Sequence, residues 1–236
     1  MASPKVLVGC PTADAKSYCL KQYVDRVKAL TYTNKEIWLV DNSKTKDYFE
    51  QIKKEGLNVI KDEFSEMLKE RIVHSRNILR QKVIEEGYDY FLSLEQDVIP
   101  PVDIIERLLA HGKEIICGVY YGLYFDQENK PIVRPLVWAP VQEDNSKMRF
   151  MSSECKEWGA GKQKLYEIRA CGLGCVLIHR SVLEKIKFRI REDRAAFDDI
   201  VFCDDAASNG FKIYADLSLH CEHMIGDQVK DDKSKW

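Results

Sequence analysis

Residues 87–97 read Gly-Tyr-Asp-Tyr-Phe-Leu-Ser-Leu-Glu-Gln-Asp, which joins an apolar run directly to a group of acids. The run from residue 88 to residue 94 follows a glycine and is rich in aromatic and aliphatic residues, a pattern typical of a β-strand. Glu95 and Asp97 leave the end of this strand within three residues. In open parallel sheets, ligands bind at the carboxyl ends of the strands. The stretch therefore predicts a central strand with an acidic ligand site at its end.

Strand-like runs and helix-like segments alternate around this stretch, from residue 5 to residue 119. From Ser17 to Leu30 the apolar residues recur three and four positions apart, the spacing of an amphipathic helix. The expected strands are 5–10, 36–41, 57–61, 88–94 and 114–119, and the expected helices are 17–30, 45–55, 64–86 and 101–111. This alternation predicts right-handed crossovers and a mostly parallel sheet with helices on both faces.

The pattern changes after Tyr120. Residues 122–164 are rich in Pro, Gly and charge, so we expect mostly loop there, with one strand at 132–137. The remaining expected strands are 165–170, 175–179 and 211–215, and the remaining expected helices are 181–186 and 198–208. Because no repeat or linker divides the sequence into two cores, we expect a single α/β domain over residues 1–236.

Composition excludes several classes of protein. Hydrophobic residues make up 45% of the 236 residues, enough for a sizeable core. Lys and Arg number 36 against 38 Asp and Glu, so no basic excess favours nucleic acid or anionic lipid. No apolar run approaches the roughly 18 residues of a membrane span, and the first residues lack a signal-peptide pattern. We therefore expect a cytoplasmic protein without a membrane span, whose eight cysteines are buried free thiols.

Polar residues stand at the ends of three predicted strands, and they are Pro11 and Thr12, Asp41 and Asn42, and Glu95, Gln96 and Asp97. Two neighbouring acids on one buried strand end need a cation, and oxygen ligands suit Mg²⁺ or Mn²⁺ held partly by substrate phosphates. Simpler interpretations remain open. Asp41 is also typical of a turn or a helix cap, and Asp97 is also suited to capping the helix that follows Pro101.

Four segments, in this order, resemble the inverting glycosyltransferases of the GT-A fold, especially the family 2 group. They are Ser75-Arg76-Asn77 with the helix and the 87–97 stretch after it, the Gly-rich run 171–180, the run Asp-Asp-Ile-Val-Phe-Cys at 198–203, and the run 210–216. The resemblance covers most of the chain. It implies a single GT-A-like domain with a Rossmann-like sheet, a nucleotide-sugar-binding half (1–120), and a smaller mixed acceptor-binding and catalytic half (121–236).

The same resemblance implies metal-dependent transfer of a sugar from a nucleoside-diphosphate sugar to an acceptor hydroxyl, with inversion. Carried over by position, the nucleotide-sugar contacts are Pro11, Thr12, Asp41, Arg76, Glu95 and Gln96. The implied ligands of the divalent metal, Mn²⁺ or Mg²⁺, are Asp97, Glu95 and His223, with His220 as the alternative histidine. Asp199 matches the general base and Asp198 its acidic neighbour.

Several alternatives stay open for the residues in the second half. Asp198 and Asp199 also suit a helix N-cap with an acidic first turn. A zinc site from Cys171, Cys175, Cys221 and His223 has a poor ligand spacing. The aromatic residues Tyr120, Tyr121, Tyr124, Phe125 and Trp138 either line an acceptor groove or pack in the core. Trp158 stands in a loop whose composition suits either a lid or a plain surface segment.

Two other functions compete with glycosyl transfer. A catalytically silent sugar-nucleotide or glycan-binding module would use the same fold, because fold does not fix function. A nucleotidyltransferase is less favoured, because residues 9–14 lack the Gly-rich basic loop that cradles a triphosphate. The sequence leaves open the base and sugar of the donor, and whether the acceptor is a glycan, a lipid-linked sugar or a protein.

Overall fold

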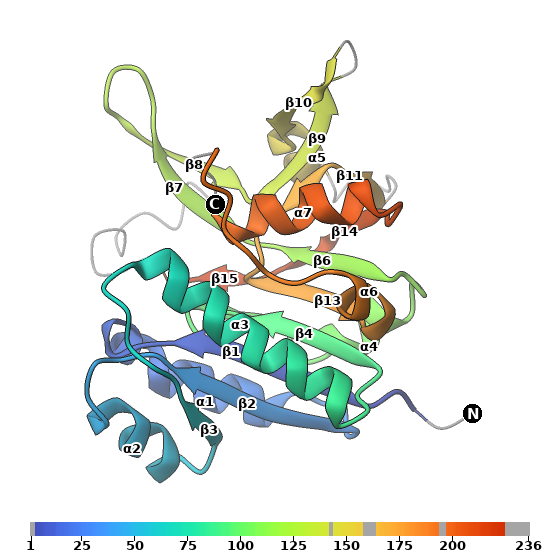
Figure 1. The fold of residues 1–236 in the computed structure, drawn as a ribbon. Coiled ribbons are helices and arrows are strands. Elements are labelled where there is room, and N and C mark those ends of the chain that lie inside the picture. Colours follow the sequence, from blue (N-terminus) through green and yellow to red (C-terminus); the bar gives the residue numbers. More distant parts are fainter. Residues whose placement is uncertain (1–2, 142–143, 158–163, 194–196, 225–236) are drawn as a thin grey trace.

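The computed structural model describes residues 3–141, 144–157, 164–193 and 197–224. Its centre is an eight-stranded sheet in the order β11-β14-β6-β13-β4-β1-β2-β3 (Figure 1). These strands are β1 (Val6–Thr12), β2 (Lys35–Asp41), β3 (Asn58–Lys61), β4 (Tyr90–Leu94), β6 (Ile115–Val119), β11 (Leu165–Ile168), β13 (Cys175–His179) and β14 (Ile213–His220). The helical segments are η1 (Asp14–Cys19), α1 (Leu20–Ala29), α2 (Asp47–Lys54), α3 (Leu68–Glu85), α4 (Ile104–Leu109), α5 (Ser152–Glu157), α6 (Arg180–Lys185) and α7 (Asp198–Ser208).

Most neighbouring strands run in parallel, which confirms the prediction of a mostly parallel α/β sheet. β1 pairs in parallel with β2 and with β4, and β14 pairs in parallel with β6. β13 is antiparallel to both of its neighbours, β4 and β6. Its first residue, Cys175, therefore lies opposite Leu94, the last residue of β4. This places the Gly-rich turn before β13 against the acids after β4, and the Glu95 N–H donates to the Gly174 carbonyl at 3.0 Å.

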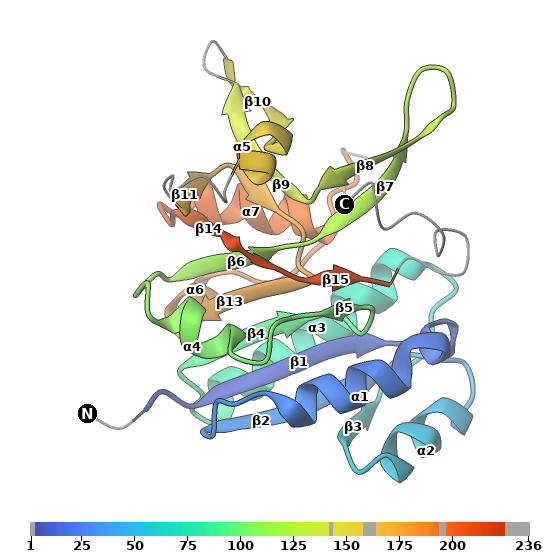
Figure 2. The same ribbon diagram turned by 180° about the vertical axis from the view of Figure 1, so that it is seen from behind.

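Helices cover both faces of the sheet, as predicted. Figure 1 shows α3, α6 and α7 on one face, and Figure 2 shows α1 and α4 on the other. Successive residues of β4 serve the two faces, because side chains alternate along a strand. Phe91 packs in the core cluster that contains Leu79 and Phe202, whereas Leu92 packs in the cluster that contains Tyr23 and Ile104. The sheet is therefore buried on both sides.

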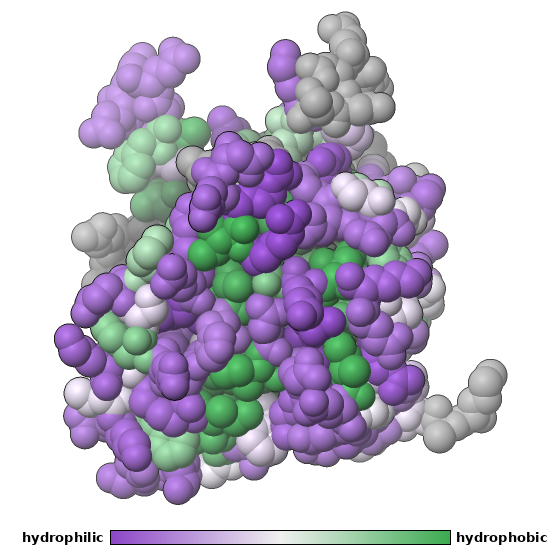
Figure 3. All heavy atoms as spheres, viewed as in Figure 1, coloured by the Kyte–Doolittle hydropathy of each residue, from purple (hydrophilic) through white to green (hydrophobic). Residues whose placement is uncertain are grey.

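The expectation of a loop-rich stretch at 122–164 is wrong. β7 (Tyr121–Phe125) and β8 (Pro131–Pro135) form an antiparallel hairpin, and β9 (Val137–Val141) pairs with β10 (Asp144–Phe150). Among the described residues, the charged ones between β7 and β8 are exposed at the turn, whereas Gly122 and Pro135 are buried within these two strands. Asp126 closes the β7–β8 turn by accepting from the backbone N–H groups of Glu128 and Lys130, each at 2.9 Å. Figure 3 shows the polar tip and the hydrophobic stem of this hairpin.

Some predicted boundaries also differ from the structure. The segment predicted as one helix from Ser17 is a 3-10 helix followed by α1, and the helix predicted from residue 64 begins at Leu68. The strand predicted at 211–215 extends to His220. Two short strands, β5 (Val98–Ile99) and β15 (Glu222–His223), pair with each other, and β12 (Ala170–Cys171) pairs with β9. The β5–β15 pair brings the end of the described chain beside Glu95-Gln96-Asp97, which we call the acid motif.

All eight cysteines are among the described residues, and each is a buried free thiol, as expected. Their burial among apolar neighbours raises the pKa of several, including Cys19 to about 11 and Cys155 to about 12. The thiols of Cys19 and Cys155 are therefore un-ionised at neutral pH. Within the part of the chain that the structure describes, no helix is both long and apolar enough to cross a bilayer.

Gly9 gives a test of the packing between β1 and α3. A Cβ atom at this position would lie 2.4 Å from Cε2 of Phe91 and 3.1 Å from Cδ1 of Leu79, both of which are fully buried. We expect Gly9→Ala to lower the free energy of unfolding by roughly 1–3 kcal/mol, because an overpacked core must shift to accept the methyl group. Urea denaturation measures this loss as a lower midpoint at an unchanged slope.

The matched control is Gly122→Ala. Its added Cβ would lie 3.2 Å from both Cδ2 of Leu136 and Cε2 of Tyr124, outside the central sheet, and should cost less because neither contact is as short as the 2.4 Å at Gly9. Equal midpoints for Gly9→Ala and the unmodified protein would contradict the packing described for β1.

Candidate active site

Gln96, the middle residue of the acid motif, holds the motif in place. Its Oε1 accepts hydrogen bonds from the hydroxyls of Thr12 and Tyr48, the latter at 2.9 Å. Its Nε2 donates to the Lys16 carbonyl at 2.6 Å. Thr12 and Gln96 are both buried, and their polar groups bind each other. Their predicted contacts with a nucleotide sugar stay predictions.

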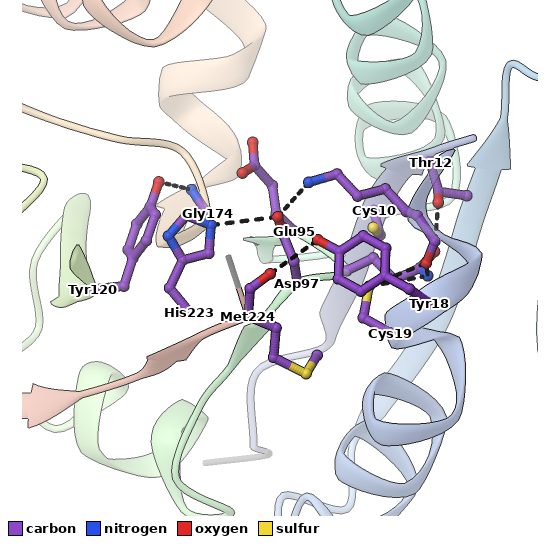
Figure 4. Close-up of polar contacts among 12 residues, drawn as sticks. Cys10, Thr12, Tyr18, Cys19, Glu95, Asp97, Tyr120, Gly174, His223 and Met224 are labelled. Atoms are coloured by element: carbon purple, nitrogen blue, oxygen red, sulfur yellow. Dashed lines mark hydrogen bonds and ion pairs between the residues drawn. The ribbon is translucent and has the colours of Figure 1, made fainter. Parts of the chain in front are cut away.

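Asp97 is a buried carboxylate that lies between the Lys16 ammonium and the His223 imidazole. Its Oδ2 binds the Lys16 ammonium and lies 3.3 Å from Nε2 of His223 (Figure 4). Burial alone would raise the pKa of Asp97, but His223 and Lys16 outweigh burial and lower it to about 2. Its other oxygen, Oδ1, is buried without a hydrogen-bond partner. Asp97 therefore carries a permanent negative charge and one oxygen that is free to accept. The helix after it begins at Ile104 with Asp103 as the N-cap, so Asp97 is not a helix cap.

His223 is the histidine beside Asp97. Its Nδ1 lies 2.6 Å from the Tyr121 carbonyl, and this contact requires Nδ1 to carry the proton. In the neutral ring, Nε2 then presents its lone pair toward Asp97, the arrangement typical of metal-binding histidines. Burial would lower the pKa of His223, but the Asp97 carboxylate raises it above its ordinary value. His220 instead stacks on the Tyr121 ring, with centroids 5.9 Å apart.

Arg76 links the acid motif to helix α7. This buried guanidinium donates to Oε1 of Glu95 at 2.5 Å and to the Ser93 hydroxyl at 2.8 Å, and it pairs with Oδ2 of Asp198 at 2.8 Å. Burial would lower the pKa of Arg76, but Asp198 and Glu95 raise it above its ordinary value. The guanidinium is therefore always charged, and it joins two other predicted site residues, Glu95 and Asp198. As placed, it is surrounded by protein groups, so its contact with a nucleotide stays a prediction.

Asp199 lies in the first turn of α7. Phe197 is the N-cap residue and makes no side-chain cap, so Asp198 and Asp199 form an acidic first turn without capping the helix. Burial raises the pKa of Asp199 to about 6, and the charges of Asp198 and Glu95 add to the effect. The Ile200 N–H, which donates to Oδ1 at 2.7 Å, only partly opposes this rise. Asp199 is therefore a carboxylate that changes charge near neutral pH.

Asp41 lies at the end of β2, opposite Thr12 in the register with β1. Its side chain is fully buried, and Oδ1 accepts from the Ser43 backbone N–H at 3.0 Å and from the Ser43 hydroxyl. Lys61 Nζ lies 3.2 Å from its Oδ2. These contacts are those of a buried turn residue, and a donor contact by Asp41 stays a prediction. Pro11, one residue before Thr12, is half-buried at the same strand end.

Some, but not all, of the side chains predicted as metal ligands are placed to bind a divalent metal. The free Oδ1 of Asp97 and the Nε2 of His223 are suitable ligands, and Mg²⁺ and Mn²⁺ sites commonly take their remaining ligands from water and phosphate oxygens. Glu95 gives one oxygen to Arg76, and its role as a metal ligand stays a prediction. Among the described residues no group of three His, Cys, Asp or Glu side chains is arranged to hold a metal. Cys171, Cys175, Cys221 and His223, the alternative zinc ligands, are therefore not arranged as a zinc site.

The sequence pattern does not indicate Lys16 as a site residue, and it leaves Tyr120 open between an acceptor groove and the core. Lys16 lies in a polar segment without a recognisable motif, and it meets Asp97 across 81 positions of sequence. Tyr120 is buried, its hydroxyl accepts from the Gly174 N–H at 2.9 Å, and its ring meets His223 edge-on. A Cβ on either Gly172 or Gly174 would overlap Tyr120, so these glycines admit its ring. In the sequence, only the repeated glycines at 172 and 174 indicated that a large side chain packs against this turn.

The other aromatic candidates divide between core and surface. Trp138 is buried against Phe150, whereas Phe125 is 60% exposed on the β7–β8 hairpin. Tyr124 is half-buried and meets Phe150 edge-on, with ring centroids 5.1 Å apart. Trp158, whose loop suits either a lid or a plain surface segment, lies outside the described residues.

No profile of a known protein family and no curated protein matches the sequence. Among solved structures, GalNAc-T7 with UDP, GalNAc and Mn²⁺ aligns with 93% of this chain at 14% identity and a TM-score of 0.63. The mannosyltransferase PcManGT from Pyrobaculum calidifontis, in complex with GDP-Man and Mn²⁺, aligns with 97% at 13% identity and a TM-score of 0.61. A197 from STIV aligns with 94% of this chain and 86% of its own length at 18% identity, with a TM-score of only 0.49.

The present chain spans 44% of the GalNAc-T7 chain and 59% of the mannosyltransferase chain. At these identities the likeness shows the fold, which is the GT-A fold of glycosyltransferases. This confirms the fold expected from the four sequence segments. Membership of the family 2 group within that fold stays a prediction.

The raised pKa of Asp199 predicts a pH-dependent effect on stability. The carboxyl has an ordinary value of 3.8 and a value of about 6 in the folded protein, so its ionisation opposes folding. The protonated Asp199 carboxyl contributes to the free energy of unfolding below pH 3.8, and this contribution is lost as the pH rises through about 6. Asp199→Asn cannot ionise. We expect its free energy of unfolding, relative to the unmodified protein, to be higher at pH 8 than at pH 4 by on the order of 1–3 kcal/mol.

Urea denaturation of both proteins at the two pH values measures this difference. Asp25→Asn removes an exposed carboxylate on α1 and serves as the control. A relative stability of Asp199→Asn that does not change between pH 4 and pH 8 would show that Asp199 titrates like an exposed acid.

Proposed function

We propose that this protein is a metal-dependent inverting glycosyltransferase that uses a nucleoside-diphosphate sugar, with Asp199 as the general base. The observation that carries the proposal is the bridge made by Arg76. Its guanidinium joins Glu95 of the acid motif to Asp198 of α7, and so fixes an ionised acid, Asp97, and an acid of raised pKa, Asp199, relative to each other. Two carboxylates with pKa values pushed apart are typical of a site that binds charge and moves a proton. The GT-A fold of the chain is consistent with this chemistry.

On the donor side, Asp97 and His223 would hold the divalent cation, with Glu95 as a further candidate. When bound, such a cation offsets the negative charge that develops on the leaving diphosphate. Gln96 and Tyr121 orient these two ligands, because Gln96 anchors the acid motif and the Tyr121 carbonyl fixes the proton on Nδ1 of His223. The protein supplies a preorganised site, which lowers the reorganisation needed during the reaction.

On the acceptor side, Asp199 would accept the proton of the attacking hydroxyl. The hydroxyl oxygen bonds to the anomeric carbon, and the bond between that carbon and the diphosphate oxygen breaks. Attack from the face opposite the leaving group inverts the anomeric centre. The pKa of Asp199, about 6, keeps it ionised at neutral pH yet basic enough to take a proton, and a positioned base contributes roughly 10²–10⁴-fold.

The two hairpins that rise above the sheet are the proposed acceptor side. Tyr124 on β7 and Phe150 on β10 are in edge-to-face contact, which connects the hairpins. Burial raises the pKa of Tyr124, and the charge of Asp199 adds to this effect. An acceptor that packs against these aromatic rings would bring its hydroxyl to Asp199. The base and the sugar of the donor are not distinguished by these residues.

Asp97→Ala tests the donor side. With the unmodified protein we expect UDP or GDP to raise the melting temperature when Mn²⁺ is present, because a ligand that binds only the folded protein stabilises it. Asp97→Ala should lose this Mn²⁺-dependent shift. Differential scanning fluorimetry measures it, and Asp103→Ala, at the more exposed N-cap of α4, is the control. A full shift in Asp97→Ala would remove Asp97 as a metal ligand.

Asp199→Asn tests the acceptor side. We expect its turnover to fall at least about 100-fold while donor binding is kept, because the positioned base is lost. In the unmodified protein, kcat/KM should fall as the pH drops below about 6, where Asp199 takes up a proton and can no longer act as base. Release of nucleoside diphosphate from UDP- and GDP-sugars, measured across this pH range, gives both results.

Asp205→Asn is the matched control, because Asp205 lies on the same helix and pairs with Arg189 at the surface. Turnover that is unchanged in Asp199→Asn would remove the base assignment. Donor binding with no turnover on any acceptor, in the unmodified protein, would instead favour a catalytically silent sugar-nucleotide or glycan-binding module.

A further inference from the structure

Lys16 lies at the entrance to the buried acid Asp97. It belongs to η1, and its ammonium binds Oδ2 of Asp97. The side chain of Lys16 is 40% exposed, whereas that of Asp97 is 5% exposed. The lysine therefore extends from the solvent side onto a carboxylate that lies within the protein. In Figure 4, Asp97 has His223 on one side and the residues of η1, including Tyr18, on the other.

The backbone of Lys16 is held firmly although its side chain reaches solvent. Its carbonyl accepts from Nε2 of Gln96 at 2.6 Å, and its N–H donates to the Ala13 carbonyl at 2.8 Å. Tyr18 secures the same segment by donating its hydroxyl to the Met224 carbonyl at 2.9 Å. Gln96 thus fixes the backbone of Lys16, and Asp97 forms an ion pair with the Lys16 ammonium. Only the flexible four-carbon stem has to rotate for the ammonium to reach a second partner.

The ammonium and a divalent cation would compete for the same acid. Asp97 already faces Lys16 and His223, and a further double positive charge beside the ammonium would be repelled strongly at this degree of burial. A displaced lysine has a natural partner in a diphosphate, because lysine binds phosphate as a point charge. Arg76, another cation close to the acid motif, is engaged by Glu95 and Asp198.

We propose that Lys16 exchanges between two partners: it neutralises Asp97 when no donor is bound, and it binds the donor's diphosphate when a divalent cation occupies Asp97. This rests on the proposed function, because it requires a nucleoside diphosphate at the acid motif. The exchange makes binding of cation and of nucleotide cooperative. The cation alone must displace Lys16, whereas the nucleotide offers the displaced ammonium a new anion. Thermodynamic linkage requires each ligand to favour the other by the same factor.

Lys16→Met tests the exchange by binding measurements that need no turnover. Without nucleotide, we expect this variant to bind Mn²⁺ at least about tenfold more tightly than the unmodified protein, because the competing charge is gone. With Mn²⁺ saturating, it should bind UDP or GDP at least about tenfold more weakly. Titration followed by the electron paramagnetic resonance of free Mn²⁺, and calorimetry with each nucleotide, give the two affinities. Lys21→Met, which removes an exposed lysine paired with Asp25 on α1, is the control.

A second measurement uses the unmodified protein, so the proposal remains testable if Lys16→Met does not fold. Acetylation of lysines by a limiting amine-reactive ester, read by mass spectrometry, compares Lys16 with Lys21 in the same sample. We expect Mn²⁺ alone to increase labelling of Lys16, because its ammonium leaves Asp97. Adding UDP or GDP should then reduce this labelling. Labelling that responds to neither ligand, while the ligands bind, would overturn the exchange.

The outcomes separate this proposal from the proposed function. If Lys16→Met binds Mn²⁺ and nucleotide as Lys21→Met does, Lys16 is only a structural ion pair and the exchange is wrong. If the unmodified protein binds nucleotide without Mn²⁺ through Lys16, the lysine replaces the metal and the exchange is again wrong, although donor binding stands. If neither UDP nor GDP binds with or without Mn²⁺, the proposed function itself fails.

Discussion

The arrangement of the candidate site depends on one buried guanidinium, that of Arg76, which is held by acids from two separate parts of the chain. Glu95 follows strand β4, Asp198 opens helix α7, and Arg76 projects from α3 between them. Burying a charge costs free energy unless partners surround it, and removing one partner of such a group is strongly destabilising. The bridge therefore constrains the position of α7 over the sheet. Asp199, the next residue on that helix, is oriented as a consequence.

Charged neighbours are distributed unevenly around the acids of the site, and as a result the pKa values of Asp97 and Asp199 shift in opposite directions. Asp97 has His223 and Lys16 as neighbours, and their interactions lower its pKa to about 2. Asp199 lies next to Asp198 and near Glu95, and burial together with these charges raises its pKa to about 6. The same kind of side chain thus becomes a permanent anion in one place and a titrating group in the other. Environments that separate pKa values in this way underlie the division of labour between carboxylates in many enzymes.

The antiparallel strand β13 supplies the second constraint. A parallel strand at this place would begin at the opposite edge of the sheet, but β13 begins beside the end of β4. The turn before it, Gly172 to Gly174, consequently lies under the Tyr120 ring and against the backbone of Glu95. Tyr120 in turn meets the ring of His223. This part of the candidate site is therefore formed by packing among glycine, tyrosine and histidine, as well as by the charged groups.

The alternation of strands and helices up to residue 119, the central strand 88–94 and the acids after it could all be predicted from the sequence, because these features depend on residues close together in the chain. Only the tertiary structure placed β13 antiparallel, built two hairpins from the stretch expected to be loop, and brought Lys16 and His223 to Asp97 across 81 and 126 positions. Local periodicity records which face of an element is apolar. It does not record which strand becomes a neighbour, and contacts between distant residues follow from that choice.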